Sequence, residues 1–507
     1  MQNPSNRWRR TASLSALALS LIASTATAAD RTTSAQRDEF YWLGEFNKAS
    51  LVMVVERGIV PRPLGTKIAD AVAKVIDNGE LPGAKRPADY LQLEPLITAI
   101  AGPDATRMHS GRSRQDIIPT TLRVMQRDRL LELSAKLDEV RGKLLALAAR
   151  NTDTIVPAYT NGVQAQPTTY AHYLLGFTAV FDRDAERLRQ AYARLNLSPL
   201  GAAALGTSSF PVDRPRLADL LGFDGVDENS YDAAQLAPMD TGTELVSIAA
   251  SIAQITGAFV EDIHTQYHET QPWIMLREGR LTGPSSIMPQ KRNPYGLNVT
   301  RLQASDVVGD AVTYLFESHN VTPGMPDYKR TDPSRTLDAT TDMLTKLSAL
   351  VDGLVIDPAR SLAEVDADYS TTTELADTLQ READVPFRLG HHFASELVTF
   401  GRSHHLKPAD IPYGEAQRIY AEAAHGESIA ETLPLSELQF HQTLNARNMV
   451  TVAKGLGGPQ PVEVARMLAA GKVRLDQDIA WRTGRSESLL AAQKRLNAAF
   501  TALRNPT

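Results

Sequence analysis

Three long stretches of this chain repeat an apolar side chain every three or four residues, a spacing that strongly limits the possible folds. The stretches consist of Leu130, Leu133, Leu137, Val140, Leu144 and Leu147; of Leu245, Ile248, Ile252, Ile255 and Phe259; and of Leu337, Thr340, Leu344, Leu347, Val351 and Leu354. Because a helix has about 3.6 residues per turn, each stretch lines up its apolar side chains along one side of a long helix. Such a side has to be buried against other helices. The sequence therefore predicts an all-α fold with a central bundle of long helices, the first of which we expect to start at Pro119.

The composition is that of a large globular protein. The chain has 507 residues, 43% of them hydrophobic, and a net charge of -6. A chain of this length buries a sizeable core and divides into several domains, and its charge gives no indication of nucleic-acid binding. We expect no membrane span after the N-terminus, because no later segment approaches the ~18 apolar residues that a span requires. The absence of cysteine excludes disulfides and thiol chemistry.

The N-terminus has the three parts of a secretory signal peptide in the required order. Arginines at positions 7, 9 and 10 precede an apolar run over residues 12–23, and Ala26-Thr27-Ala28 follows as a cleavage site of small residues. The alternative is a frayed, alanine-rich helix. We predict that residues 1–28 are a signal peptide and that the mature protein is periplasmic or secreted, without a membrane anchor.

Residues 283–294, Gly-Pro-Ser-Ser-Ile-Met-Pro-Gln-Lys-Arg-Asn-Pro, combine two hydroxyls, a lysine and an amide. Their glycine and prolines keep the backbone out of a helix. A serine hydroxyl becomes a base only when its alkoxide is stabilised, which the backbone amides of such a loop and the charge of Lys291 can do. We therefore predict that Ser285 acts as a base and that Lys291 assists it. The alternative is a proline-rich surface turn.

A second polar motif, His-Ser-Gly-Arg-Ser-Arg-Gln-Asp at residues 109–116, places Ser113 between Arg112 and Arg114. Guanidinium groups form paired, charge-assisted hydrogen bonds to carboxylates, so the motif suits a substrate that carries one. From the spacing alone, an exposed basic turn remains the alternative. A third polar stretch, residues 159–169, contains a proline near its end and predicts a loop before the next helix.

Together these motifs resemble those of the aspartase/fumarase superfamily, and Phe-Pro-Val-Asp-Arg at residues 210–214 resembles its argininosuccinate-lyase-like branch. The resemblance covers nearly all of the chain after the signal peptide. It implies an N-terminal helical domain at 29–118, a central helix-bundle domain at 119–365 and a C-terminal domain of short helices at 366–507. It also implies a homotetramer with active sites shared between subunits, and carbon–nitrogen lyase activity (EC 4.3).

The resemblance implies contacts to a small dicarboxylate substrate from all three motifs and from one later stretch. Besides the catalytic pair, the implied substrate-binding residues are Ser113, Arg114, Gln115, Thr160, Asn161, Ser286, Met288, Asn293 and Tyr328. Gln115 stands where related lyases have an asparagine, and Asn161 stands where they have a histidine that serves acid–base chemistry. The glutamate that orients this histidine is replaced by Asn298, so both members of the pair are lost together.

Three functions remain open from the sequence. The first is a lyase that releases fumarate from an N-substituted aspartate, similar to lyases that degrade ethylenediamine disuccinate or iminodisuccinate. The second is a genuine argininosuccinate lyase, which export and Pro333, at a glutamine position of the branch, disfavour. The third is a non-catalytic relative of the kind found in eye lens, which the intact Ser285, Lys291 and Asn293 disfavour. No cofactor is implied, and we expect no metal at His391-His392 or His404-His405, because no acidic residue completes a ligand set.

Overall fold

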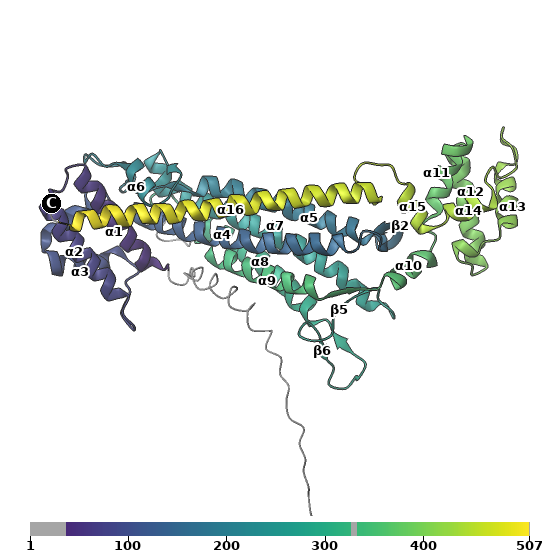
Figure 1. Ribbon diagram of the computed structural model, residues 1–507, viewed down its shortest axis with the longest axis horizontal. Coiled ribbons are helices and arrows are strands. Elements are labelled where there is room, and N and C mark those ends of the chain that lie inside the picture. The colour runs from purple at the N-terminus through teal and green to yellow at the C-terminus, as the bar shows by residue number, and fades with distance from the viewer. Residues whose placement is uncertain (1–36, 326–331, 506–507) are drawn as a thin grey trace, which may run out of the picture.

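The computed structural model describes residues 37–325 and 332–505, and most of its regular structure is helical. The molecule is an elongated rod, with an N-terminal domain at one end, long helices in the middle and a C-terminal domain at the other end (Figure 1). The predicted signal peptide and Tyr328 lie outside the described residues. The predicted all-α fold with a central bundle of long helices is confirmed.

The N-terminal domain contains α1 (Glu39–Glu56), α2 (Arg62–Gly79), α3 (Tyr90–Ala101) and a 3₁₀ turn at Pro103–His109. A short turn joins α1 to α2, and Pro63 lies in the first turn of α2, where a missing N–H loses no helical partner. The apolar sides of α1, α2 and α3 meet in one core. This domain lies beside the start of the first long helix and therefore next to the 109–116 motif.

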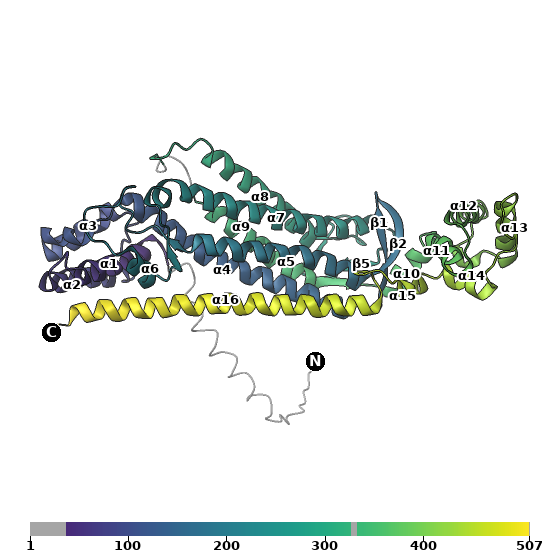
Figure 2. The ribbon, with the colours of Figure 1, turned by 90° about the horizontal axis from the view of Figure 1, so that it is seen from above.

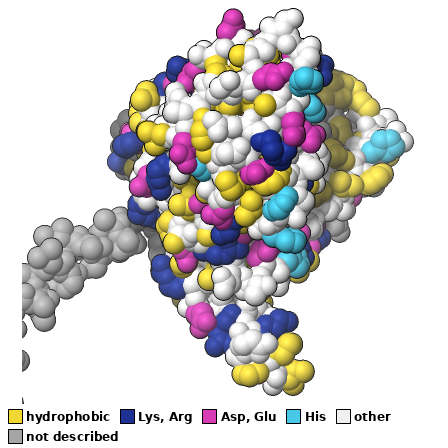
Figure 3. Space-filling model, turned by 90° about the vertical axis from the view of Figure 1, so that its right-hand side faces the viewer, with side chains coloured by type: hydrophobic (Ala, Val, Ile, Leu, Met, Phe, Trp, Pro, Cys, Tyr) yellow, Lys and Arg dark blue, Asp and Glu magenta, His cyan; other side chains and the backbone are white. Residues whose placement is uncertain are grey.

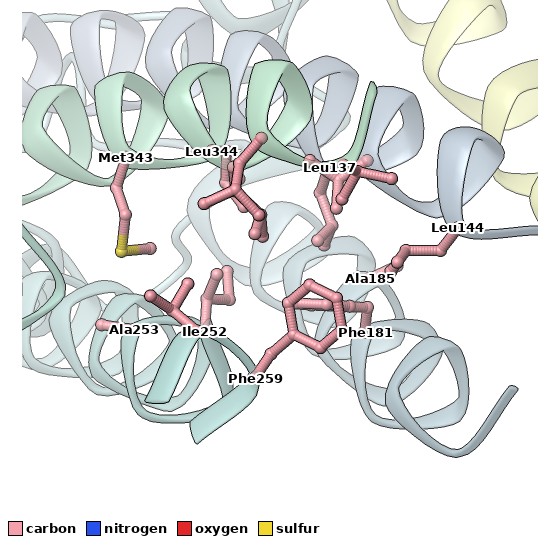
Figure 4. Close-up of a cluster of buried hydrophobic side chains, with 14 of the residues drawn as sticks. Leu137, Leu144, Phe181, Ala185, Ile252, Ala253, Phe259, Met343 and Leu344 are labelled. Carbon is pink, nitrogen blue, oxygen red and sulfur yellow. The ribbon is translucent and has the colours of Figure 1, made fainter. Parts of the chain in front are cut away.

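The central bundle consists of α4 (Arg114–Ala149), α5 (Tyr170–Leu195), α7 (Ala237–Thr265), α8 (Tyr295–Ser318) and α9 (Ser334–Gly353). All residues of the three apolar stretches are buried except Ile255, which is half-buried. Side chains from α4, α5, α7 and α9, including Leu137, Phe181, Phe259 and Leu344, meet in the bundle core (Figure 4). Each such side chain contributes about 1.5–3 kcal/mol through burial.

The first long helix begins at Arg114, five residues before the predicted start at Pro119. Ser113 and Asp116 form a capping box. The Ser113 side chain accepts backbone N–H groups of the first turn, and the Asp116 side chain accepts the backbone N–H of Ser113. This cap starts the helix early enough that Pro119 lies within it. The predicted boundary between residues 118 and 119 therefore falls inside α4, and the boundary between 365 and 366 falls inside α10 (Pro358–Ala367).

The C-terminal region differs from the prediction of short helices to its end. Short helices do form: α11 (Thr372–Ala383), α12 (Phe387–Ser403), α13 (Tyr413–Ala424), α14 (Glu437–Thr443) and α15 (Ala446–Val452). They are followed by α16 (Pro461–Arg504), a helix of 44 residues that runs back along the bundle to the N-terminal domain (Figure 2). Val464 and Leu475 join the bundle core, whereas Leu496, Phe500 and Leu503 join the N-terminal core.

Buried ion pairs hold α16 against the bundle. Arg141 on α4 is fully buried and contacts Asp138 (3.2 Å), Asp182 on α5 (2.6 Å) and Asp478 on α16 (2.9 Å). From α16, Arg474 returns to Asp182 at 2.6 Å and the arginine at 482 returns to Asp138 at 3.1 Å. Charges of both signs therefore alternate across three helices, which fixes the register of α16 as well as its position.

One helical segment, Asp232–His268, is long and apolar enough to cross a membrane by length and composition, contrary to the expectation that no segment would be. Half of its most apolar window is buried. Leu245, Ile252 and Phe259 of this segment face α4, α5 and α9 in the bundle core. Packing within the protein therefore accounts for the buried half of this window.

Short strands connect the helices. β3 (Leu197–Ser198) pairs with β4 (Gly225–Val226) beside α6 (Arg214–Leu220), and β5 (Ile274–Leu276) pairs with β8 (Leu354–Ile356). Two hairpins carry residues of the predicted site: β1 (Ile155–Thr160) pairs with β2 (Val163–Thr169), and β6 (Gly283–Pro284) pairs with β7 (Arg292–Asn293).

Candidate active site

The segment that contains Ser285 forms a hairpin on the side of the bundle. β6 (Gly283–Pro284) pairs antiparallel with β7 (Arg292–Asn293), and the Asn293 amide donates a hydrogen bond to the Pro284 carbonyl oxygen at 3.3 Å. The hairpin projects away from the helices in Figure 1, and Figure 3 shows it below the body as a knob with basic side chains and an apolar tip. Ile287, with 83% of its surface exposed, lies at this projecting part.

Two backbone amides point at the Ser285 hydroxyl. Its Oγ accepts the N–H of Met288 at 3.1 Å and that of Ile287 at 3.4 Å. Both donors favour negative charge on this oxygen, so they stabilise the alkoxide form that a serine base requires. This arrangement is the one that we predicted for the loop, although the role of Ser285 stays a prediction.

The hairpin brings five of the predicted residues together in one short segment, namely Ser285, Ser286, Met288, Lys291 and Asn293. Ser286, Met288 and Lys291 are exposed, and Ser285 and Asn293 are half-buried. A reaction that needs water to be excluded and two carboxylates to be held cannot be completed by this exposed hairpin alone. Further walls have to come from other parts of the protein.

Ser113 and Arg114 lie at the first turn of α4. The Ser113 hydroxyl accepts the N–H of Gln115 at 3.2 Å, and Arg114 Nε lies 3.8 Å from Asp89. The N-terminal end of a long helix favours anions, because its first N–H groups have no helical partner and its dipole is positive there. The helix end at Arg114 is therefore a place where an anion could bind, and the role of Arg114 stays a prediction.

Arg112, the other arginine of the motif, does not face this helix end. It is buried in the N-terminal domain, where its guanidinium donates to the Ser50 hydroxyl and the Asn47 amide oxygen, both at 2.9 Å, and lies over the Tyr90 ring. Arg112 also donates to Nδ1 of His109 at 3.1 Å, and burial together with this charge lowers the pKa of His109 to about 3. Arg112 and His109 therefore attach the 109–116 motif to the N-terminal domain and do not face the end of α4.

Asp116 is a residue of the motif whose importance the sequence analysis missed. It is fully buried and accepts the N–H groups of Ser113 (2.9 Å), Gly201 (2.8 Å) and Ala203 (3.0 Å). Burial raises its pKa to about 6, although these three hydrogen bonds act in the opposite direction. The signal that could have found it is the spacing Ser-x-x-Asp of a capping box.

Thr160 and Asn161 lie at the tip of a β-hairpin, where we had predicted a loop. β1 (Ile155–Thr160) pairs with β2 (Val163–Thr169), and Asn161 and Gly162 form the two-residue turn with positive φ angles of 51° and 77°. Asn-Gly is the preferred pair for this kind of turn, because both residues tolerate a left-handed backbone. Thr160 and Asn161 are both exposed at this tip.

The structure does not bring the three groups of predicted residues together within one chain. Ser113 lies at the start of α4, whereas the β1–β2 hairpin follows its end, so the 36 residues of α4 separate them by roughly 54 Å. The β6–β7 hairpin projects from the bundle at a third place (Figure 1). Each motif therefore has its own local structure, but none of them forms a complete substrate site within one chain.

Among residues 37–325 and 332–505, no three His, Asp or Glu side chains gather so that they could hold a metal ion. His404 instead packs on the Phe400 ring at 4.2 Å, at the end of α12.

Comparison with known proteins identifies relatives along most of the chain. A family described as lyase matches residues 71–309, and one described as argininosuccinate lyase C-terminal matches residues 369–450. Argininosuccinate lyase of Methanoculleus marisnigri is 34% identical over 408 residues, which cover 79% of this chain and 80% of that protein. Argininosuccinate lyase 2 of Agrobacterium fabrum is 34% identical over 475 residues, which cover 90% and 91%.

Solved structures are similar over the whole fold. EDDS lyase in complex with formate has a TM-score of 0.84 and 27% identity, covering 94% of each chain, and a variant with bound fumarate has the same score and coverage at 28% identity. Class II fumarase from Schistosoma mansoni, with a TM-score of 0.60 and 15% identity over 81% of this chain and 90% of that one, shares the fold. The predicted superfamily and its branch are thus confirmed, and the chain belongs to the argininosuccinate lyase family of carbon–nitrogen lyases.

Proposed function

We propose that this lyase releases fumarate from an N-substituted aspartate by base-catalysed elimination, and that it adds an amine to fumarate in the reverse direction. The observation that carries the proposal is the Ser285 hydroxyl, which accepts two backbone N–H groups on a hairpin that also presents Lys291 and Asn293. The membership of the argininosuccinate lyase family and the likeness to EDDS lyase support this reaction class.

In the proposed reaction, Ser285 as the alkoxide takes a proton from the carbon next to a substrate carboxylate. The electron pair of the broken C–H bond moves into that carboxylate and makes it a doubly negative enediolate. The charge of Lys291 stabilises this intermediate, while Ser286 and Asn293 hold the substrate carboxylates by hydrogen bonds. The electron pair then returns to form the carbon–carbon double bond while the carbon–nitrogen bond breaks, which yields fumarate and the free amine.

The substitutions at Asn161 and Asn298 favour an amine that leaves without an enzymic acid. An amine that is already protonated departs as a neutral molecule, so it does not need the histidine that the family usually supplies. Hydroxide would need that acid far more. We therefore propose a carbon–nitrogen substrate rather than a hydration reaction.

Argininosuccinate is the second candidate substrate, because the curated relatives at 34% identity are argininosuccinate lyases. The two candidates are separated by incubating the purified protein with argininosuccinate, ethylenediamine disuccinate and iminodisuccinate and following fumarate by absorbance. Faster release from the last two supports the proposal, and release from argininosuccinate alone replaces it by the second candidate. If fumarate is released from none of the three substrates, the remaining candidate is a non-catalytic relative.

We further propose that the chain forms a homotetramer whose active sites combine motifs from different subunits. The roughly 54 Å between the ends of α4 supports this, because one chain cannot join Ser113 to Thr160. α8 also exposes an apolar stripe: Tyr295, Leu302 and Phe316 have exposed fractions of 59%, 63% and 75%, at positions seven or fourteen residues apart. A stripe at heptad spacing suits packing against a helix of another subunit.

Mixing two inactive variants tests the shared site. We expect Arg114→Ala and Ser285→Ala tetramers to be nearly inactive alone and to regain up to about a quarter of the wild-type rate after joint unfolding and refolding. In a random mixture, one site in four combines an intact Arg114 with an intact Ser285 from another subunit. Light scattering measures the assembly, and fumarate release measures the recovery. A mixed tetramer that stays inactive, or an active monomer, contradicts the proposal.

We also propose export, based on the signal-peptide pattern of residues 1–28. Intact-mass spectrometry of protein recovered from the periplasm or medium is expected to show a chain that begins close to residue 29. Replacing the arginines at 9 and 10 by alanine separates the two export routes, because a twin-arginine route requires both. An intact N-terminus on cytoplasmic protein would contradict the proposal.

A further inference from the structure

The loop at residues 201–212 lies against the start of α4, although the sequence analysis assigned it no role. Asp116 holds its beginning, through the N–H groups of Gly201 and Ala203. A side chain at Gly111 would lie 2.4 Å from Val212 and 2.9 Å from the Ser208 hydroxyl, so the 109–116 motif also packs tightly against the far half of the loop. The loop thus touches the motif of Ser113 and Arg114 at both of its ends.

Gln235 holds the middle of this loop. Its side chain is 1% exposed, and its amide Nε2 donates to the carbonyl oxygen of Ala204 at 3.0 Å. Its Oε1 accepts the N–H of Gly324 at 2.9 Å. One buried amide therefore joins two loops that are 120 positions apart, since Ala204 and Gly324 both bind to it.

The backbone around Gln235 is unusual on both sides of this contact. Asp232–Leu236 is a π-helical turn that leads into α7, and such turns are rare and frequent at functional sites. Ala203 and Thr207, on either side of Ala204, have positive φ angles of 55° and 59°. Non-glycine residues keep this strained conformation only where their surroundings hold them in it, as Asp116 does for Ala203 and the Ala202 carbonyl does for Thr207.

A continuous chain of hydrogen bonds therefore runs from the candidate site through the loop. Ser113 binds Asp116, Asp116 binds Ala203, and the next residue, Ala204, binds Gln235. All of the linking side chains are buried, where hydrogen bonds are not exchanged for bonds to water. Gln235 is thus connected, through these bonds and the peptide bond between Ala203 and Ala204, to the residues that frame Ser113.

We propose that Gln235 is a positioning residue of the lyase site, which holds the 201–212 loop so that Ser113 and Arg114 can bind a substrate carboxylate. This inference rests on the proposed function. Gln235 itself need not touch substrate. Because Ser285 lies on a separate hairpin, loosening the loop weakens substrate binding and leaves the proton transfer largely unchanged.

Two variants of Gln235 and one matched control test this role. Gln235→Met removes both hydrogen bonds at nearly constant volume, whereas Gln235→Glu keeps the acceptor for Gly324 and loses the donor to Ala204. The control is Gln126→Met. Gln126 is also 1% exposed, and its amide atoms have no hydrogen-bond partner within the described residues, so this variant changes a buried glutamine that holds no loop.

We expect Gln235→Met to raise KM roughly tenfold or more while kcat falls less than about threefold, and Gln235→Glu to raise KM by a similar factor, because it also loses the donor to Ala204. In Gln126→Met, KM stays at the wild-type value. Hydrogen exchange of the amides of Gly201 and Ala203 is expected to speed up in Gln235→Met and not in the control. Fumarate binding, measured by calorimetry, is expected to weaken in parallel with KM.

The outcomes separate this inference from the proposed function. If wild-type protein neither releases nor binds fumarate, the proposed function fails and the inference fails with it. If the wild type is active and both Gln235 variants match Gln126→Met in KM and in amide exchange, the inference alone is overturned. The same holds if Gln235→Met lowers only the unfolding temperature. If Gln235→Met does not fold, KM and amide exchange of Gln235→Glu are compared with those of Gln126→Met instead.

Discussion

Replacing Ser285 with alanine is expected to lower the turnover of fumarate release by about 10²- to 10⁴-fold, the range for loss of a positioned proton-transfer group. The substitution removes the oxygen that accepts the N–H groups of Ile287 and Met288, so no alkoxide can form there. Steady-state kinetics on the best substrate of the panel measure the loss. Calorimetry with fumarate is expected to show retained binding, because Arg114, Thr160 and Lys291 are unchanged.

Ser286→Ala is the matched comparison, since its hydroxyl is the next one along the same hairpin. We expect Ser286→Ala to raise KM more than it lowers kcat, as the loss of a binding contact does. If the large loss of kcat occurs in Ser286→Ala instead, the base has been assigned to the wrong serine. Turnover like that of the wild type in both variants would remove the hairpin from the proton transfer.

Replacing Arg141 with methionine is expected to lower the free energy of unfolding by about 3 kcal/mol, because it leaves buried carboxylates without their shared partner. The loss lies toward the lower end for a broken buried pair, since Arg474 and the arginine at 482 still face Asp182 and Asp138. Urea unfolding at fixed protein concentration measures it, as assembly makes stability depend on concentration.

Lys472→Met is the control for this measurement. Lys472 pairs with Asp476 at 3.0 Å on the outer side of α16, with 72% of its side chain exposed. We expect a change within about 0.5 kcal/mol, as is usual for exposed pairs. Equal changes in Lys472→Met and Arg141→Met would show that the buried network adds nothing to the attachment of α16.

The central helices were predictable because burial on one side of a long helix leaves a dense apolar repeat, as in Leu130 to Leu147. α16 was not, since it lies on the outside of the bundle and buries few of its residues, such as Leu475 and Leu496. Much of its attachment comes from ion pairs such as that of Asp478 with Arg141. In the sequence, such charged residues cannot be distinguished from those of a solvent-exposed helix face.

The local structure around Ser285 was predictable from the sequence, whereas the distances between the three motifs were not. The loop from Ser285 to Asn293 carries its chemistry in adjacent residues, and the backbone amides that support Ser285 belong to the same loop. Arg112 and Arg114 could not be told apart, because only the cap at Ser113 decides which of them turns into the N-terminal domain. The hairpin at Asn161 had a readable signal in its Asn-Gly pair, which the resemblance to a family histidine position obscured.

The return of α16 to the N-terminal domain has a consequence for the order in which the chain folds. The Tyr41 hydroxyl receives a hydrogen bond of 2.6 Å from Gln493, 452 positions later, and Phe500 fills the core between α1 and α2. A ribosome makes the N-terminal helices first, yet their apolar core closes only when the last helix has been synthesised. In a chain with so late a closing step, the N-terminal core stays open until the last helix has been made.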